Sequence, residues 1–168
     1  MKVVDAVVEK AFFKQDYFTL FGLDLRFHIN LERLDNAYTK LQKRYHPDRF
    51  SLKQEKIFFQ KVILFINEGY NVLLNDIKRA QCILDILDVD YSDEVLSKYT
   101  GVFAEILTFK ELNAEARDLN MLRVMYRKNA DLFDENCKGE EKNHELLASI
   151  FVKLRFLYKL IYDTDTDH

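Results

Sequence analysis

The sequence contains few of the residues that break helices or form cross-links. Its 168 residues include only one proline and four glycines, so few positions interrupt a helix. It has no tryptophan, and its two cysteines, Cys82 and Cys137, are far apart and belong to no Cys-x-x-Cys set of zinc ligands. We therefore expect two reduced thiols, as in cytoplasmic proteins, and neither a bound metal nor a cofactor.

Long apolar runs are also missing. No uninterrupted apolar stretch approaches the ~20 residues of a membrane helix. The first fourteen residues contain Asp5 and Glu9 and lack the apolar core of a secretory signal. With 48% hydrophobic residues, 32% charged residues and a net charge of -3, the composition predicts a soluble, cytoplasmic globular protein. It gives no general reason to bind a membrane or nucleic acid.

The punctuation that exists predicts a short helix and then a longer one. Asp16 can cap a helix over residues 17–21, and Gly22 can end it in the left-handed conformation. Asn30 can cap a second helix, which should end before Pro47 because the residue before a proline is disfavoured in helical geometry. Apolar residues at three- and four-residue steps form one stripe on this helix: Leu31, Leu34, Tyr38, Leu41 and Tyr45.

Further helices are predicted from there to the end of the chain. Ser51 and Gln54 resemble a capping box that opens a third helix reaching Leu73, and Asn75-Asp76 should separate it from a short helix over residues 77–87. Another helix should run from about residue 93 to about 133, with an interruption at 100–101. After a polar loop containing Gly139, the last helix should span about 140–162.

These patterns predict an all-α protein, without sustained period-two alternation or internal repeats. A lead-in at 1–15 precedes an N-terminal domain at 16–75, a helical hairpin with a short first helix. This domain is joined to a C-terminal antiparallel three-helix bundle at 76–168. Residues 1–75 hold twelve Lys/Arg and nine Asp/Glu, net +3, whereas the rest of the chain has a net charge of -6. This asymmetry favours two modules with different partners.

The most specific local signal is the turn His46-Pro47-Asp48, which holds the only proline. It directly follows the second predicted helix, whose side away from the apolar stripe is basic. Four cations contribute to this basic side: Arg33, Lys40, Lys43 and Arg44. A helix end with a proline turn is common in proteins of any function, and here the rigid turn extends the positive face of the helix.

Two segments together resemble a known family. They are Asp-Tyr-Phe-Thr-Leu-Phe-Gly-Leu at 16–23, and Tyr38-x-x-Leu41-x-x-x-Tyr45 followed by His-Pro-Asp-Arg-Phe at 46–50. This pattern resembles a J-domain. The early position of the domain, the overall length and the segment Lys-Leu-Arg-Phe-Leu-Tyr-Lys-Leu at 153–160 are similar to HscB-type J-domain co-chaperones of iron–sulfur cluster biogenesis. The resemblance covers nearly the whole chain.

The resemblance implies a role for the turn and its basic neighbours. In this family the His-Pro-Asp turn stimulates ATP hydrolysis by a DnaK- or HscA-type chaperone, and basic residues of the second helix dock on that ATPase. Carried over to this sequence, the chaperone-binding residues are His46, Pro47, Asp48, Lys40, Lys43, Arg44 and Arg49. The chain itself would not be an enzyme.

A second site is expected on the C-terminal bundle. If Leu112, Ala116, Leu119 and Tyr126 are the buried stripe of the long helix, then Phe103, Ile106 and Leu107 fall outside it. Phe156 points about 120° away from the stripe of the last helix, which consists of Ile150, Leu154, Leu157 and Ile161. The resemblance implies that Ile106, Leu107 and Phe156, with Phe103 beside them, bind an IscU-type iron–sulfur scaffold protein. Either Lys110 or Phe109 occupies one further position of that patch. Packing of these side chains inside the bundle is the alternative.

Three other functions remain to be compared with this hypothesis. An enzyme could use His46 as a base oriented by Asp48, but the sequence offers no nucleophile or glycine-rich phosphate loop beside them. A DNA-binding helix-turn-helix would need a more basic third helix and a less acidic chain. A general J-domain co-chaperone with other clients is the alternative within the same class, and binding to an iron–sulfur scaffold would distinguish the two.

Overall fold

The computed structural model describes residues 11–99, 101, 104, 119–138 and 143–162. All regular elements in this part of the chain are helical, as predicted. They are α2 (Tyr17–Phe21), α3 (Leu31–Tyr45), the 3-10 helix η1 (Pro47–Arg49), α4 (Lys53–Leu74), α5 (Asp76–Ile86), α6 (Asp93–Ser97), α8 (Leu119–Lys138) and α9 (His144–Tyr162). The chain forms two compact units, and the short segment Arg26–His28 belongs to the second unit together with the residues from Arg79 onward.

The helix ends of the first unit follow from local sequence. The carboxylate of Asp16 accepts a hydrogen bond from the Thr19 N–H at 2.8 Å, and Gly22 ends α2 with φ of 63°. The side chain of Asn30 caps α3 by accepting from the Arg33 N–H at 2.9 Å. Both N-caps and the left-handed glycine were predicted from the sequence, because side-chain capping satisfies backbone N–H groups that have no partner within the helix.

The predicted capping box at Ser51 is wrong. The N-cap of α4 is Leu52, whose side chain makes no capping hydrogen bond, and the first backbone bond of the helix joins the Lys56 N–H to the Leu52 carbonyl at 3.0 Å. The helix therefore starts one residue later than the box requires, so Ser51 and Gln54 are not at the N-cap and N3 positions.

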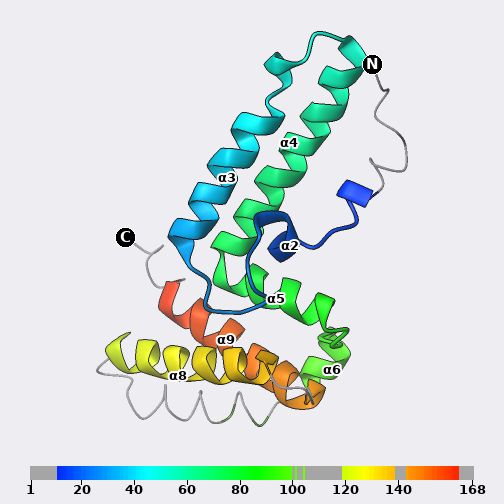
Figure 1. Ribbon diagram of the computed structural model, residues 1–168. Helices are drawn as coiled ribbons and strands as arrows, with labels where there is room; N and C mark the ends of the chain where they lie inside the picture. Colours follow the sequence, from blue (N-terminus) through cyan, green and yellow to red (C-terminus); the bar gives the residue numbers. More distant parts are fainter. Residues whose placement is uncertain (1–10, 100, 102–103, 105–118, 139–142, 163–168) are drawn as a thin grey trace. The chain divides into compact units, whose positions relative to one another are not determined.

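The first unit is a hairpin of α3 and α4 joined by η1, and α2 packs against both helices (Figure 1). Its core consists of Phe18, Leu20, Phe21, Leu34, Val62, Ile66 and Leu73. An aromatic and a polar contact also join the two helices of the hairpin. The Tyr38 and Tyr70 rings stack with their centroids 4.2 Å apart, and the Tyr70 hydroxyl donates to the Asp35 carboxylate at 2.9 Å. This hydrogen bond, together with burial and the charge of Asp35, raises the pKa of Tyr70.

Gly69 permits the close approach of α2 to α4. It is buried, and a Cβ added at this position would lie 2.5 Å from Cδ1 of Tyr17. Real Cβ atoms do not come so close to a ring carbon, so a larger residue would push the two elements apart. The glycine that weakens the helix in isolation therefore serves its packing.

The helix α4 is also long and apolar enough to cross a membrane, and among the described residues it is the only helix that meets this test. Its buried positions, which include Val62, Ile66 and Leu73, form part of the core of the hairpin. Core helices of water-soluble domains meet the same test of length and composition, so this finding does not favour a membrane function.

In the second unit two predicted helix ends are displaced. The helix α8 continues to Lys138, five residues beyond the predicted end at 133. The helix α9 begins at His144 rather than at about 140, because Asn143 caps it by accepting from the Leu146 N–H at 2.9 Å. The predicted break before α5 is confirmed, since the side chain of Asn75 accepts from the Lys78 N–H at 3.0 Å.

The core of the second unit is formed mainly by α9, which packs against α8 and α6. The predicted stripe of Ile150, Leu154, Leu157 and Ile161 is buried. Further buried apolar residues come from α5, α8 and the start of α9: Ala80, Ile83, Leu84, Ala130, Phe133, Leu147 and Phe151. Burial of so many large side chains supplies the main stabilising term of this unit.

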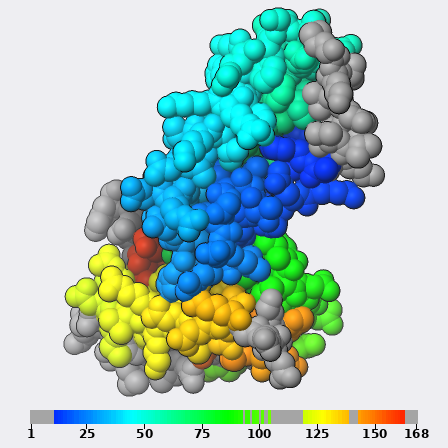
Figure 2. Space-filling model, in the orientation of Figure 1, coloured from blue at the N-terminus to red at the C-terminus, as the bar shows by residue number. Residues whose placement is uncertain are grey.

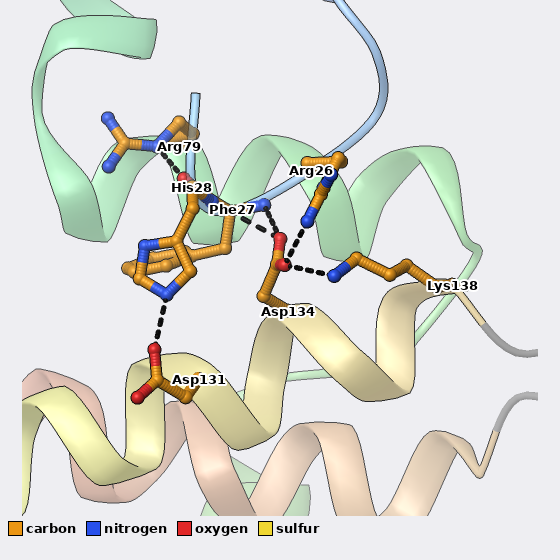
Figure 3. Close-up of polar contacts among 7 residues, drawn as sticks. All are labelled: Arg26, Phe27, His28, Arg79, Asp131, Asp134 and Lys138. Carbon is orange, nitrogen blue, oxygen red and sulfur yellow. Dashed lines mark hydrogen bonds and ion pairs between the residues drawn. The ribbon is translucent and has the colours of Figure 1, made fainter. Parts of the chain in front are cut away.

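A buried carboxylate fixes the segment Arg26–His28 within this unit (Figure 3). Asp134, whose side chain is only 3% exposed, accepts hydrogen bonds from the backbone N–H groups of Phe27 and His28 at 2.8 and 3.2 Å. Arg26 and Lys138 also contact its carboxylate, at 3.0 and 2.7 Å. Burial favours the neutral acid, but the hydrogen bonds from Arg26, Lys138 and the His28 N–H, together with the Arg26 charge, outweigh it and lower the pKa of Asp134 to about 2.

Aromatic and cationic contacts complete this attachment. The Phe27 ring is 1% exposed and meets Phe133 edge to face at 5.6 Å. The buried Arg79 donates through Nε to the Phe27 carbonyl at 2.7 Å and places its guanidinium 5.0 Å from the centre of the same ring. The backbone of the buried Phe27 thus has a partner for both its N–H and its C=O group.

Candidate docking turn

The chain leaves α3 through a turn whose geometry Pro47 determines. His46 has φ of -57° and ψ of 126°, outside the helical region, as expected for a residue that precedes proline. Pro47 is the first residue of η1, where its missing N–H costs no hydrogen bond. The His46 carbonyl accepts from the Arg49 N–H at 3.1 Å, which closes the turn. The prediction that α3 ends before Pro47 is confirmed.

The polar groups of this turn face solvent. The His46 side chain is 54% exposed and that of Asp48 is 88% exposed. His46 Nδ1 accepts from the Asp48 N–H at 3.3 Å and lies 3.6 Å from Asp48 Oδ2. Exposed pairs of this kind contribute little to stability. The imidazole edge and the carboxylate are therefore available to a partner.

The predicted basic residues lie around the same turn. Lys40, Lys43, Arg44 and Arg49 are all exposed. Arg49 donates to the Lys43 carbonyl at 2.9 Å, and so satisfies an acceptor in the last turn of α3 while keeping its charge at the surface. The cyan end of α3 and η1 form part of the visible surface in Figure 2. The structure thus groups the four cations with His46 and Asp48 at one end of the hairpin.

Two aromatic residues of the J-domain-like pattern, Tyr45 and Phe50, flank the turn. Tyr45 precedes His46 and stacks on Phe59 at 5.9 Å, and Phe50 follows Arg49 and stacks on the same Phe59 ring at 3.6 Å. The shared ring ties the entry of the turn to its exit. Aromatic residues at both borders of a proline turn are the sequence signal that could have revealed this support.

The predicted scaffold-binding patch falls mostly outside the described residues. Phe103, Ile106 and Leu107 belong to that part of the chain, as do Phe109 and Lys110. Phe156 lies on α9 and is half-buried. The arrangement of the patch therefore stays a prediction. Among the described residues there is no group of three or more His, Cys, Asp or Glu side chains that could hold a metal ion.

Comparisons with known proteins give relatives over most of the chain. The Co-chaperone protein HscB of Proteus mirabilis is 32% identical over 160 residues, which cover 86% of this chain and 91% of the relative. The Co-chaperone protein HscB homolog of Aromatoleum aromaticum is 31% identical over 164 residues, covering 90% and 93%. No protein-family model matches the chain.

Solved structures show the same fold. Chaperone HscB from Vibrio cholerae has a TM-score of 0.65 at 23% identity and covers 90% of this chain and 96% of its own. The human co-chaperone protein HscB has a TM-score of 0.66 at 20% identity, covering 92% and 84%.

Fold and turn together define the class: a J-domain, presenting its His-Pro-Asp turn, joined to a helical C-terminal bundle. Within that class, sequence identity over most of the chain decides the family. The chain belongs to the HscB family of co-chaperones.

Proposed function

We propose that this protein is a cytoplasmic adaptor for iron–sulfur cluster biogenesis. Its bundle would bind an IscU-type scaffold protein, and its J-domain would stimulate ATP hydrolysis by a DnaK- or HscA-type chaperone. Membership of the HscB family supports the general role. The observation that carries the proposal is the exposed turn at His46, Pro47 and Asp48, held rigidly at the end of a cationic helix.

The geometry suggests a division of labour on the J-domain. Exposed Lys40, Lys43, Arg44 and Arg49 would attract an acidic surface of the chaperone ATPase and orient the encounter. Pro47 would keep His46 and Asp48 in one conformation, so that little entropy is lost when they engage the ATPase. ATP hydrolysis takes place in the chaperone, and this chain would contribute only differential binding to the hydrolysing state.

The scaffold would bind to the apolar patch of the bundle. We assign this role to Ile106, Leu107 and Phe156, with Phe103 beside them. Phe156 is half-buried on α9, so part of this residue is accessible, as an apolar contact residue requires. Holding scaffold and chaperone at once would raise the local concentration of the client at the chaperone.

Single-turnover ATP hydrolysis tests the first part. Rates of the DnaK- and HscA-type chaperones are measured with and without this protein and an IscU-type scaffold. His46→Gln should abolish stimulation, whereas His144→Gln, the same change at an exposed residue of α9, should leave it intact. Synergy between scaffold and wild-type protein is expected. Stimulation without scaffold dependence would indicate a general J-domain co-chaperone, and no stimulation would contradict the proposal.

Scaffold binding tests the second part. The double variant Leu107→Ala with Phe156→Ala should weaken scaffold affinity at least tenfold, because truncation of buried apolar anchor residues usually costs this much affinity. The ATPase stimulation that is measured in the absence of scaffold should stay unchanged. Val124→Ala, which truncates an apolar side chain that is 62% exposed on α8, is the matched control. If the double variant and His46→Gln each lost both scaffold affinity and ATPase stimulation, the separation into two sites would be contradicted.

A further inference from the structure

The segment before the J-domain contacts the residue that precedes the His-Pro-Asp turn. Phe12 and Phe13 meet edge to face at 5.5 Å. A local turn presents them, in which the Lys14 N–H donates to the Ala11 carbonyl at 3.3 Å and Gln15 Nε2 to the Phe12 carbonyl at 2.9 Å. Both rings are half-buried against the hairpin.

The two rings have different neighbours. Phe12 meets Tyr45 at 5.6 Å and Phe65 at 6.0 Å, whereas Phe13 meets Phe58 at 6.3 Å and Phe65 at 5.3 Å. Phe12 therefore contacts both helices of the hairpin, whereas the two hairpin rings that Phe13 meets, Phe58 and Phe65, both lie on α4. Phe12 contacts Tyr45 directly, whereas Phe13 is linked to the Tyr45 ring only indirectly, through Phe58 and Phe59.

Tyr45 is the last residue of α3 and is bonded directly to His46. Its ring is held by Phe12 and Phe59, and the guanidinium of Arg44 lies 5.3 Å from its centre. The last turn of a helix frays readily because its carbonyls have no partner within the helix. Packing of the Tyr45 ring opposes fraying at the point where the backbone must leave the helix to form the turn.

We propose that Phe12 is a positioning residue for the chaperone-docking turn, acting through Tyr45 on His46 and Arg44. The proposal rests on the function proposed above. Without the Phe12 ring, the docking conformation of residues 44–48 is populated less in the free protein. The apparent affinity for the chaperone then falls in proportion to that population, while the saturated rate is unchanged.

The test is a titration of the chaperone with this protein in single-turnover ATP hydrolysis. Phe12→Ala should raise the half-saturating concentration by about three- to tenfold, with the same maximal rate, for a docking conformation populated at about 10–30%. Phe13→Ala removes a ring of equal size that does not contact Tyr45, and should shift that concentration less than twofold. Phe12→Tyr should restore the wild-type value.

Hydrogen exchange of the Asp48 and Arg49 amides provides a second readout that needs no chaperone. Phe12→Ala should accelerate exchange at these two amides several-fold while the amides of Val62 and Ile66 stay protected. If Phe12→Ala unfolds the protein, Phe12→Leu serves instead. Equal effects of Phe12→Ala and Phe13→Ala, or none, would overturn the inference. Wild-type activity of His46→Gln would instead overturn the proposed function.

Discussion

The docking turn of the first unit and the Asp134 cluster of the second unit are both built from cations and carboxylates, yet their surroundings are opposite. The Asp48 side chain is 88% exposed, and its carboxylate lies 3.6 Å from His46 Nδ1, whereas the Asp134 side chain is 3% exposed and its carboxylate takes part in four hydrogen bonds or ion pairs. A carboxylate in water gains little from a nearby cation, and a buried one depends on its partners. The first cluster is thus free to bind a partner, and the second stabilises the fold.

The largest loss of stability is expected for Asp134→Asn. The amide can still accept from the Phe27 and His28 N–H groups but loses its ion pairs with Arg26 and Lys138, so the free energy of unfolding should fall by about 1–3 kcal/mol. Urea unfolding measures this change. Asp131→Asn, on the same helix, is the control, because the Asp131 carboxylate is 68% exposed and binds an exposed His28. Similar losses in both variants would contradict the role of burial.

The same carboxylate predicts a dependence on pH. Its pKa is about 2 in the folded protein and near 3.8 when unfolded, so its contribution is complete only above about pH 5, declines as the pH falls through 3.8 and is nearly lost once the pH falls through about 2. The difference corresponds to about 2 kcal/mol. Urea unfolding of wild-type and Asp134→Asn protein between pH 2 and 5 should show curves that converge at the acid end. A constant separation across this range would contradict the assignment.

A smaller loss is expected for Gly69→Ala in the hairpin. Alanine favours a helix by about 1 kcal/mol over glycine, but its Cβ would overlap the Tyr17 ring, so we expect a net destabilisation of about 1 kcal/mol. Thermal unfolding checks the sign. In a Tyr17→Leu background the same substitution should cost less, and a double-mutant cycle measures the difference. An equal cost in both backgrounds would exclude the overlap as its cause.

The smallest effect on stability is expected at the turn, where the functional effect is the largest. His46→Gln should change the free energy of unfolding by less than about 0.5 kcal/mol, as is usual for exposed positions. Thermal unfolding and the ATPase assay, carried out on the same sample, give the stability of the variant and its stimulation of the chaperone. If the midpoint temperature of unfolding fell by several degrees, His46 would support the fold. The exposed turn and the buried Asp134 cluster would then not differ in their contribution to stability.

Local sequence predicted those features that depend on neighbours along the chain. The caps at Asp16 and Asn30, the left-handed Gly22 and the end of α3 before Pro47 are confirmed, because each depends on residues within one helical turn. The prediction of a capping box at Ser51 is wrong, because a local pattern does not by itself fix the residue at which a helix starts. Its pattern is present, but the register of α4 places Leu52 at the cap.

The sequence by itself determined the all-helical class, the rigid proline turn and the cations that surround it. These features follow from backbone preference and from helical periodicity. Only the tertiary structure decided that Asp134 binds Arg26 and the N–H of Phe27, more than 100 residues away, that Gly69 faces Tyr17, and that Phe12 contacts Tyr45. Such contacts depend on which surfaces the folded chain brings together, and the spacing of residues along the sequence does not show which distant residues will meet.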